Sequence, residues 1–185
     1  ARITAAGALV ESMISDLETF LATDTGDESA RTAEIDRVLN TYFDMDSITR
    51  FSAGQYWRAA SSEQKTEYGS LFREVLCGKI VRNFDQLQGL AYTADAATAK
   101  GDKFVIVSGT FTDTAGQQPA VKVAWRVLTR EGAAPKVFDI EIENLSLLIT
   151  QKQENVAVIR KNKGEFVALI NAMKDLLPNP VHNDS

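Results

Sequence analysis

The sequence predicts an α+β domain built on a five-strand antiparallel curved sheet that helices cover on one face. Residues 1–88 place apolar side chains at helical spacing, residues 90–149 alternate apolar and polar side chains, and residues 150–176 return to helical spacing. Short breaks, most of them containing Gly, divide the alternating part and favour strands that pair with their sequence neighbours. Helices on either side of one run of strands are typical of the α+β class.

The N-terminal part is expected to form two helices, over residues 3–21 and 29–42. Apolar residues recur every three or four positions in both segments, which gives each helix one apolar face. Between them, the sequence Thr-Asp-Thr-Gly-Asp at 23–27 breaks the periodicity and predicts a turn.

Residues 44–58 hold an unusual density of large side chains between two short predicted helices. Asp44 or Asp46 is expected to cap the first helix by accepting hydrogen bonds from its free backbone N–H groups. Gly54 is expected to adopt the left-handed conformation that ends this helix and turns the chain. The large apolar and aromatic side chains of the segment require burial; they are Ile48, Phe51, Tyr56 and Trp57.

A long helix is expected over residues 62–88, after the capping sequence Ser-Ser-Glu-Gln at 61–64. The only cysteine, Cys77, lies in this helix, and we interpret it as a small apolar side chain rather than a nucleophile. The helix presents a broad apolar stripe formed by Tyr68, Leu71, Phe72, Val75, Leu76, Ile80, Phe84 and Leu87.

The strands are expected to form an antiparallel meander over residues 90–94, 103–112, 120–129, 136–143 and 145–149. The alternation predicts one apolar face, which indicates a sheet covered by helices on one side only. The second strand departs from this rule, because Phe104 to Val107 supply apolar side chains to both faces. In the third and fourth strands the predicted apolar face carries Val121, Val123, Trp125, Val127, Phe138, Ile140 and Ile142, and the polar face of the fourth carries Asp139, Glu141 and Glu143.

Two more helices complete the prediction, a polar one over about 150–161 and an apolar one that ends before Pro178. We interpret residues 1–176 as a single domain and residues 177–185 as a flexible C-terminal tail.

Composition excludes several classes of site. The net charge of −5 argues against a nucleic-acid partner, because phosphate binding needs a concentrated basic surface. No apolar run approaches 18 residues, so no membrane-spanning segment is expected. The single histidine, His182, falls in the polar tail, and with one cysteine it cannot supply a zinc site. No Gly-rich phosphate-binding loop occurs either.

Four segments together resemble a known family. The first is residues 44–58, with Asp44, Asp46, Ile48, Arg50, Gly54, Tyr56, Trp57 and Arg58 in a pattern Asp-x-Asp-x-Ile-x-Arg-x-x-x-Gly-x-Tyr-Trp-Arg. Gln64, Tyr68 and Phe72 follow its Gln-x-x-x-Phe-x-x-x-Phe run, with Tyr in place of the first Phe. The third and fourth segments are 136–147, which contains Lys-Val-Phe-Asp and Glu-Asn-Leu-Ser-Leu, and the helix that starts at 164.

These segments resemble the MlaC, or toluene-tolerance, family over about residues 3–176. The family is the periplasmic phospholipid-binding component of the lipid-asymmetry ABC transport system of Gram-negative bacteria. The chain departs from the family pattern at 150–155, which reads Thr-Gln-Lys-Gln-Glu-Asn where Asn-Tyr-Arg-Ser-Gln-Phe is usual, and at Ser52-Ala53, where a more apolar pair is usual. Gln55 stands where arginine is common.

The resemblance implies a periplasmic carrier that shuttles phospholipid between an outer-membrane lipoprotein–porin complex and an inner-membrane ABC transporter complex. The chain is expected to be a monomer that uses no cofactor or metal and holds phospholipid only as cargo. Exposing an acyl chain to water costs about 0.8 kcal/mol per methylene, so two chains of roughly 16 carbons would cost about 25 kcal/mol and need an apolar cavity.

We predict this cavity between the 68–87 stripe and the apolar face of the sheet. Its expected acyl-chain contacts are Phe51, Tyr56, Trp57, Leu71, Val75, Phe84, Ile106, Val121, Val123, Trp125, Val127, Phe138, Ile140 and Ile142. Tyr56 and Trp57 are equally compatible with simple core packing. Arg50 and Arg58 are candidates for the lipid headgroup through charge-assisted hydrogen bonds, or alternatively for ion pairs with Asp44, Asp46 or Glu63.

Two other function classes fit the same fold class. The first is a small enzyme of the isomerase or dehydratase type, which would need a carboxylate pointing into an apolar pocket; Asp139, Glu141 and Glu143 are instead expected to point away from it. The second is an interaction module that binds a partner's helix in the groove.

Overall fold

The computed structural model describes residues 1–178, and residues 179–185 lie outside the described part. The predicted tail, including His182, therefore falls almost wholly beyond what the structure describes. The helices are α1 (Arg2–Ala22), α2 (Glu28–Tyr42), α3 (Met45–Ser52), α4 (Ser62–Arg82), α5 (Leu147–Lys161) and α6 (Val167–Leu176), with short 3₁₀ helices η1 (Gly54–Trp57) and η2 (Phe84–Leu87). The strands are β1 (Leu90–Lys100), β2 (Phe104–Asp113), β3 (Val121–Leu128), β4 (Lys136–Ile142) and β5 (Leu145–Ser146).

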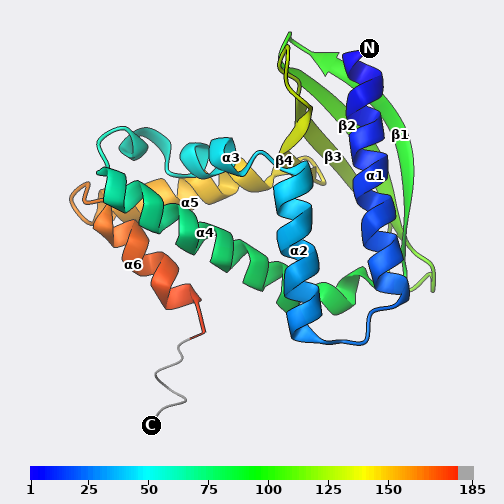
Figure 1. The fold of residues 1–185 in the computed structure, drawn as a ribbon, viewed down its shortest axis with the longest axis horizontal. Coiled ribbons are helices and arrows are strands. Elements are labelled where there is room, and N and C mark those ends of the chain that lie inside the picture. Colours follow the sequence, from blue (N-terminus) through cyan, green and yellow to red (C-terminus); the bar gives the residue numbers. More distant parts are fainter. Residues whose placement is uncertain (179–185) are drawn as a thin grey trace.

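The sheet confirms the predicted α+β meander. Its strand order is β1-β2-β3-β4-β5 and every pair is antiparallel. Figure 1 shows the curved sheet beside α1 and α2, with α3 to α6 extending to the other side of the molecule. β1 runs to Lys100 rather than ending at residue 94, because it pairs with β2 along its whole length although its last residues are mostly small and exposed.

The predicted face of Phe138 is wrong. Val127 pairs with Val137, whereas the preceding Arg126 pairs with Asp139, so Phe138 is the extra residue of a β-bulge. The bulge shifts the alternation by one position. Val137 is therefore buried in the core, while Phe138 contacts the rings of Phe51 and Phe104 at centroid distances of 5.5 and 5.8 Å.

The end of the sheet also differs from the prediction, since the expected strand over 145–149 is only two residues long and α5 starts at Leu147. Ser146 explains the early start, because its hydroxyl accepts a hydrogen bond from the Ile149 amide at 3.0 Å and caps the helix. The Asp139 carboxylate also accepts from the Leu148 amide at 3.0 Å.

The long predicted helix is shorter than expected. Its start is confirmed, because Ser61 and Gln64 form a reciprocal capping box. α4 ends at Arg82, where the amide of the Asn83 side chain donates to the Lys79 carbonyl at 2.8 Å, and η2 follows. Gly54 has a φ of 62°, which confirms the left-handed conformation predicted for it.

Three apolar clusters make up the interior. The sheet cluster joins α1 and α2 to the inner face of β2, β3 and β4. The helical cluster joins α3, α4, α5 and α6, and a third cluster joins α2, α4 and η2. Among the described residues, no side chain of α4 belongs to the sheet cluster, so the expectation that the long helix faces the sheet is wrong; α1 packs there instead (Figure 1). Within residues 1–178, no helix has the length and apolar character needed to cross a bilayer.

Candidate functional site

Phe43 lies where the three apolar clusters meet. It packs against all of them while remaining only partly buried. The chain is fixed at this point because Phe43 forms a β-bridge with Val137 and the Asp44 amide donates to the Val137 carbonyl at 3.0 Å. The connection from α2 to α3 is thereby tied to β4, and the apolar surfaces of the sheet and of the helices converge around Phe43.

The side chains around this junction are apolar but incompletely buried. Met45 packs against the helical and third clusters, and Leu17 packs against the sheet and third clusters. Half-buried apolar residues such as Leu76 and Ile80 of α4 and Ile140 of β4 lie at the margins of the same clusters. Because these partly accessible apolar side chains gather in one place, this junction is the candidate site for an apolar ligand.

Three aromatic side chains of the sheet lie close together on its core face. The rings of Tyr92 and Phe111 lie 5.0 Å apart, and the indole N–H of Trp125 donates to the Tyr92 hydroxyl at 3.1 Å. A Cβ at Gly109 would lie 2.1 Å from that hydroxyl oxygen, so only glycine leaves room for the tyrosine ring. Burial raises the pKa of Tyr92.

The predicted acyl-chain contacts do not all share one surface. Those in or beside the sheet cluster are Val121, Val123, Trp125, Val127 and Ile140, and Ile142 continues the same face to the surface. Ile106 pairs with Arg126 and lies on the opposite face, as Phe138 does. Phe84 is completely buried in the third cluster. The remaining predicted contacts belong to the helical cluster; they are Phe51, Tyr56, Trp57, Leu71 and Val75.

An exposed apolar edge patch follows β4. Ile142, Leu145, Leu147 and Ile149 are 38%, 59%, 44% and 48% exposed, and these four are among the seven exposed large apolar side chains of residues 1–178. Ile142 and Leu145 are cross-strand partners across the Glu143-Asn144 turn. Sequence reasoning placed residues 145–149 in a strand and so missed this patch; the capping residue Ser146 was the signal that could have revealed it.

The two arginines predicted for a headgroup lie in different surroundings. Arg50 lines a pocket of about 370 Å³ together with Ser47, Phe51, Gly54, Phe138 and Lys152. We call it the basic pocket. Arg58 is exposed just after η1. Within residues 1–178 neither arginine pairs with Asp44, Asp46 or Glu63, and Asp44 instead caps α3 and lies 3.4 Å from Arg130.

Comparison with protein families gives a direct match, since the family described as MlaC protein matches residues 8–175. The chain belongs to the MlaC family. A solved structure of a phospholipid-binding protein from Ralstonia solanacearum, in complex with a phospholipid, superposes with a TM-score of 0.75 at 23% sequence identity, covering 92% of this chain and 96% of that one. The two proteins therefore share a fold. Comparison with curated proteins gives no significant match.

Residues where this MlaC-family chain departs from the usual family pattern meet in one buried network. Asn155 donates to the Ser52 carbonyl at 2.9 Å and to the Tyr68 hydroxyl at 3.0 Å, and it accepts from Gln151 at 2.8 Å. The Ser52 hydroxyl bonds to the Tyr68 hydroxyl at 2.5 Å and to the Thr49 carbonyl at 2.7 Å. Burial raises the pKa of Tyr68 well above its ordinary range. The network joins α3, α4 and α5 and supplies hydrogen-bond partners to Ser52, Gln151 and Asn155.

The groups that acid–base or nucleophilic chemistry would need are already occupied or shielded. Asp139 is buried and accepts hydrogen bonds from the Ser146 hydroxyl and from the Ile140 and Leu148 amides. Glu141 pairs with Arg126 at 3.3 Å. Burial raises the pKa of the Cys77 thiol, which lowers its reactivity. Within residues 1–178, no group of three His, Cys, Asp or Glu side chains could hold a metal ion.

Proposed function

We propose that this MlaC-family chain is a non-catalytic phospholipid carrier. The observation that carries the proposal is a fold shared over 92% of the chain with a protein solved in complex with a phospholipid. The convergence of three apolar clusters at the partly buried Phe43 supports it, because acyl chains need accessible apolar surface to bind.

We place the acyl chains at this junction, against the inner face of β3 and β4. The half-buried Ile140 supplies an apolar contact there, and Ile142 continues the face toward the edge patch. The edge patch is then the mouth of the site, where an acyl chain passes between the protein and its surroundings. Ile106, Phe84 and Phe138 are left out of the proposed lining, since two lie on the other face of the sheet and one is enclosed by other side chains.

Family membership supports a proposal for the cellular role. The carrier works in the periplasm as a monomer and exchanges phospholipid with an inner-membrane ABC transporter complex and an outer-membrane lipoprotein–porin complex. It needs no cofactor or metal besides its cargo. An isomerase-type or dehydratase-type enzyme is the less favoured function, because Asp139 and Glu141 are held in hydrogen bonds and an ion pair instead of facing an apolar pocket.

The first experiment extracts the purified protein with organic solvent and measures phospholipid by mass spectrometry. Roughly one phospholipid per protein is expected. Protein that carries no phospholipid after purification, and takes none up from vesicles, would contradict the carrier function.

A second experiment tests where the acyl chains lie. Ile142→Asp should speed the loss of a fluorescent phospholipid to acceptor vesicles by about tenfold, since contact with one large apolar side chain contributes about 1.5 kcal/mol. The matched control is Val167→Asp on α6, which is 47% exposed and far along the chain from the patch. Equal loss rates in the two variants would remove the edge patch from the site.

A further inference from the structure

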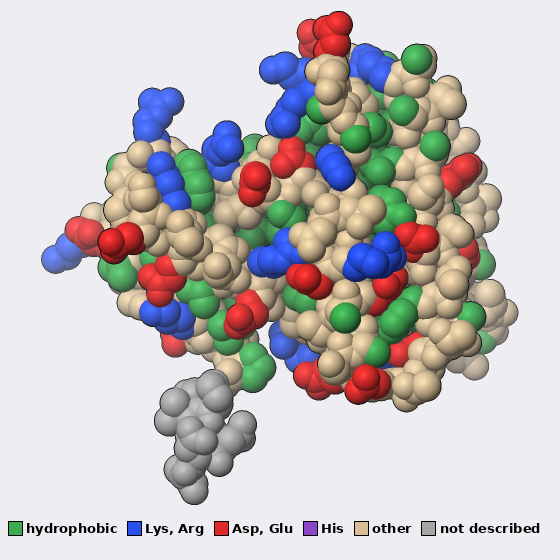
Figure 2. All heavy atoms as spheres, viewed as in Figure 1, with side chains coloured by type: hydrophobic (Ala, Val, Ile, Leu, Met, Phe, Trp, Pro, Cys, Tyr) green, Lys and Arg blue, Asp and Glu red, His purple; other side chains and the backbone are tan. Residues whose placement is uncertain are grey.

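The basic pocket has an unusual charge for this protein. Its six lining residues include two cations, Arg50 and Lys152, and no carboxylate, although the whole chain has a net charge of −5. Within residues 1–178 neither cation forms an ion pair. Figure 2 shows Lys and Arg side chains on both sides of the notch at the top of the molecule, with Asp and Glu side chains at its base. The pocket is therefore a local positive site on an acidic protein.

Lys152 is held in place by its neighbours. Its ammonium lies 4.7 Å from the centroid of the Phe51 ring, a cation–π contact. Its methylene stem lies over Gly54, where a Cβ would come within 3.4 Å of Lys152 Cε and 2.7 Å of Val156 Cγ2. Only glycine lets α5 approach this closely, so the turn at residue 54 positions the ammonium group at the pocket.

Two further arginines surround the pocket but are already neutralised. Arg130 donates to the Ser47 hydroxyl at 3.2 Å and pairs with Asp44. Arg126 lies 5.4 Å from the centroid of Phe104 and pairs with Glu141 at 3.3 Å. An anion that enters the pocket thus meets Arg50 and Lys152 as its direct cationic partners.

We propose that the basic pocket binds the phosphate group of a phosphate ester. Arg50 and Lys152 supply charge-assisted hydrogen bonds to phosphate oxygens, while the Ser47 hydroxyl already donates its proton to the Asp44 carboxylate at 2.8 Å. The Phe51 and Phe138 rings, 5.5 Å apart, form an apolar wall for the carbon part of the ester. Because no carboxylate lines the pocket, it disfavours esters that carry an ammonium group next to the phosphate, such as choline or ethanolamine headgroups.

The phosphate has two sources with the same chemistry, the headgroup of a phospholipid or a soluble phosphate ester. The lipid source rests on the proposed carrier function, whereas the soluble source does not. Phe138 lies on the opposite face of the sheet from the proposed acyl-chain site, so the two sites are built from different side chains.

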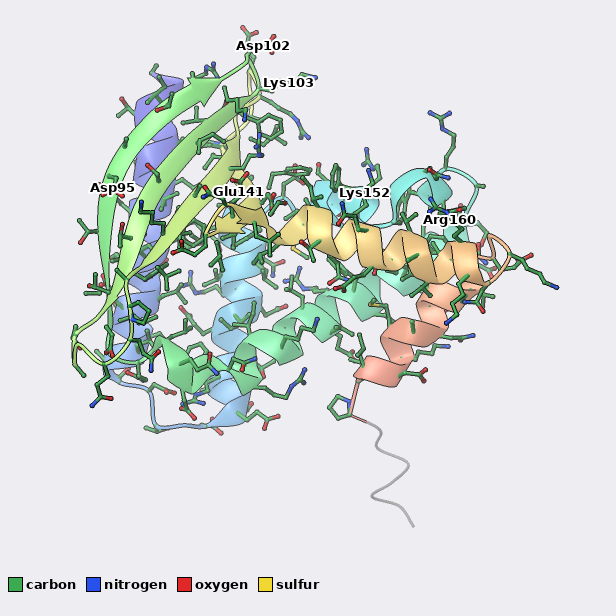
Figure 3. All side chains as sticks on the ribbon, turned by 180° about the vertical axis from the view of Figure 1, so that it is seen from behind. Asp95, Asp102, Lys103, Glu141, Lys152 and Arg160 are labelled. Atoms are coloured by element: carbon green, nitrogen blue, oxygen red, sulfur yellow. The ribbon has the colours of Figure 1, made fainter. Side chains whose placement is uncertain are left out.

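Isothermal titration calorimetry tests the proposal with three probes: sn-glycerol 3-phosphate, and the short-chain lipids dihexanoyl-phosphatidylglycerol and dihexanoyl-phosphatidylcholine as monomers. Arg50→Gln and Lys152→Gln should each weaken binding of the glycerol phosphate or the phosphatidylglycerol by about fivefold, as expected for partly exposed charge pairs. The matched controls are Arg160→Gln and Lys161→Gln, exposed cations farther along α5; Figure 3 shows Arg160 toward the far end of the helix that carries Lys152.

The outcomes separate the two sources. Binding of sn-glycerol 3-phosphate that depends on Arg50 and Lys152 supports a soluble ester. Dependence seen only with dihexanoyl-phosphatidylglycerol supports a headgroup. The proposal is overturned if neither phosphate probe binds, if both pocket variants bind like the controls, or if dihexanoyl-phosphatidylcholine binds as tightly as the glycerol lipid. Phospholipid found in the protein without any effect of these variants would refute the pocket and leave the carrier function standing.

Discussion

Replacing Asn155 should destabilise the protein far more than an asparagine substitution usually does. Asn155 is 2% exposed, and Asn155→Ala leaves the buried Ser52 carbonyl without a donor and removes one donor from the Tyr68 hydroxyl. An unsatisfied buried acceptor costs about 1–3 kcal/mol, and we expect a loss of about 2–3 kcal/mol in the free energy of unfolding. For a chain of this size that corresponds to a fall in Tm of roughly 5–10 °C.

Urea unfolding followed by circular dichroism measures the effect, with Asn171→Ala on the exposed face of α6 as the control. The control should change the unfolding free energy by less than about 0.5 kcal/mol. A triple variant, Asn155→Leu with Ser52→Ala and Tyr68→Phe, should be more stable than Asn155→Leu alone, because removing the Ser52 and Tyr68 hydroxyls leaves fewer unsatisfied groups, although the Ser52 backbone carbonyl still lacks its donor. The reasoning fails if Asn155→Ala behaves like the control, or if the triple variant is less stable than the single one.

Three further predictions concern glycines and a tyrosine. Gly54→Ala should cost at least about 1–2 kcal/mol of stability for its left-handed backbone, and the clash with Val156 should add to this cost. The control is Gly101→Ala, which has a φ of 68° and nothing within 4 Å, and so should show the backbone cost alone. Equal melting temperatures of the two variants would refute the clash. Gly109→Ala should displace Tyr92 and change the near-ultraviolet circular dichroism of Trp125, and an unchanged spectrum would contradict the close approach. Because the folded-state pKa of Tyr68 is raised from its ordinary value of 10.0, the contribution of Tyr68 to stability should be constant below pH 10 and fall as pH rises above it. Tyr68→Phe should therefore show a shallower fall in alkaline urea titrations, and an identical slope would count against the assignment.

The sequence predicted the fold class well because periodicity directly reports which face of a helix or strand is buried. The meander, the capping box at Ser61 and the turn at Gly54 were all visible in local patterns of two to four residues. Features that depend on pairing between distant segments were not visible. The bulge at Phe138 arises from its register against β3, and strict alternation therefore placed this ring on the wrong face.

The helix that covers the sheet was mispredicted for a related reason. Both α1 and α4 carry apolar faces, and no local signal indicates which of them packs on the strands. The basic pocket was likewise only half visible: Arg50 was a candidate from its motif, but Lys152 lies about 100 residues away and joins it only because α5 folds back over Gly54.

The rate of chemical labelling at Cys77, the only cysteine, can report motion between α2 and α4. Cys77 is buried between α2 and α4, with its sulfur 3.9 Å from the Thr32 carbonyl. Only 8% of Cys77 is exposed, so separation of these helices increases the access of a thiol reagent and raises the labelling rate. A ligand that binds only the closed form lowers this rate by mass action. The labelling rate of Cys77 can thus report the separation of α2 from α4 without any engineered label.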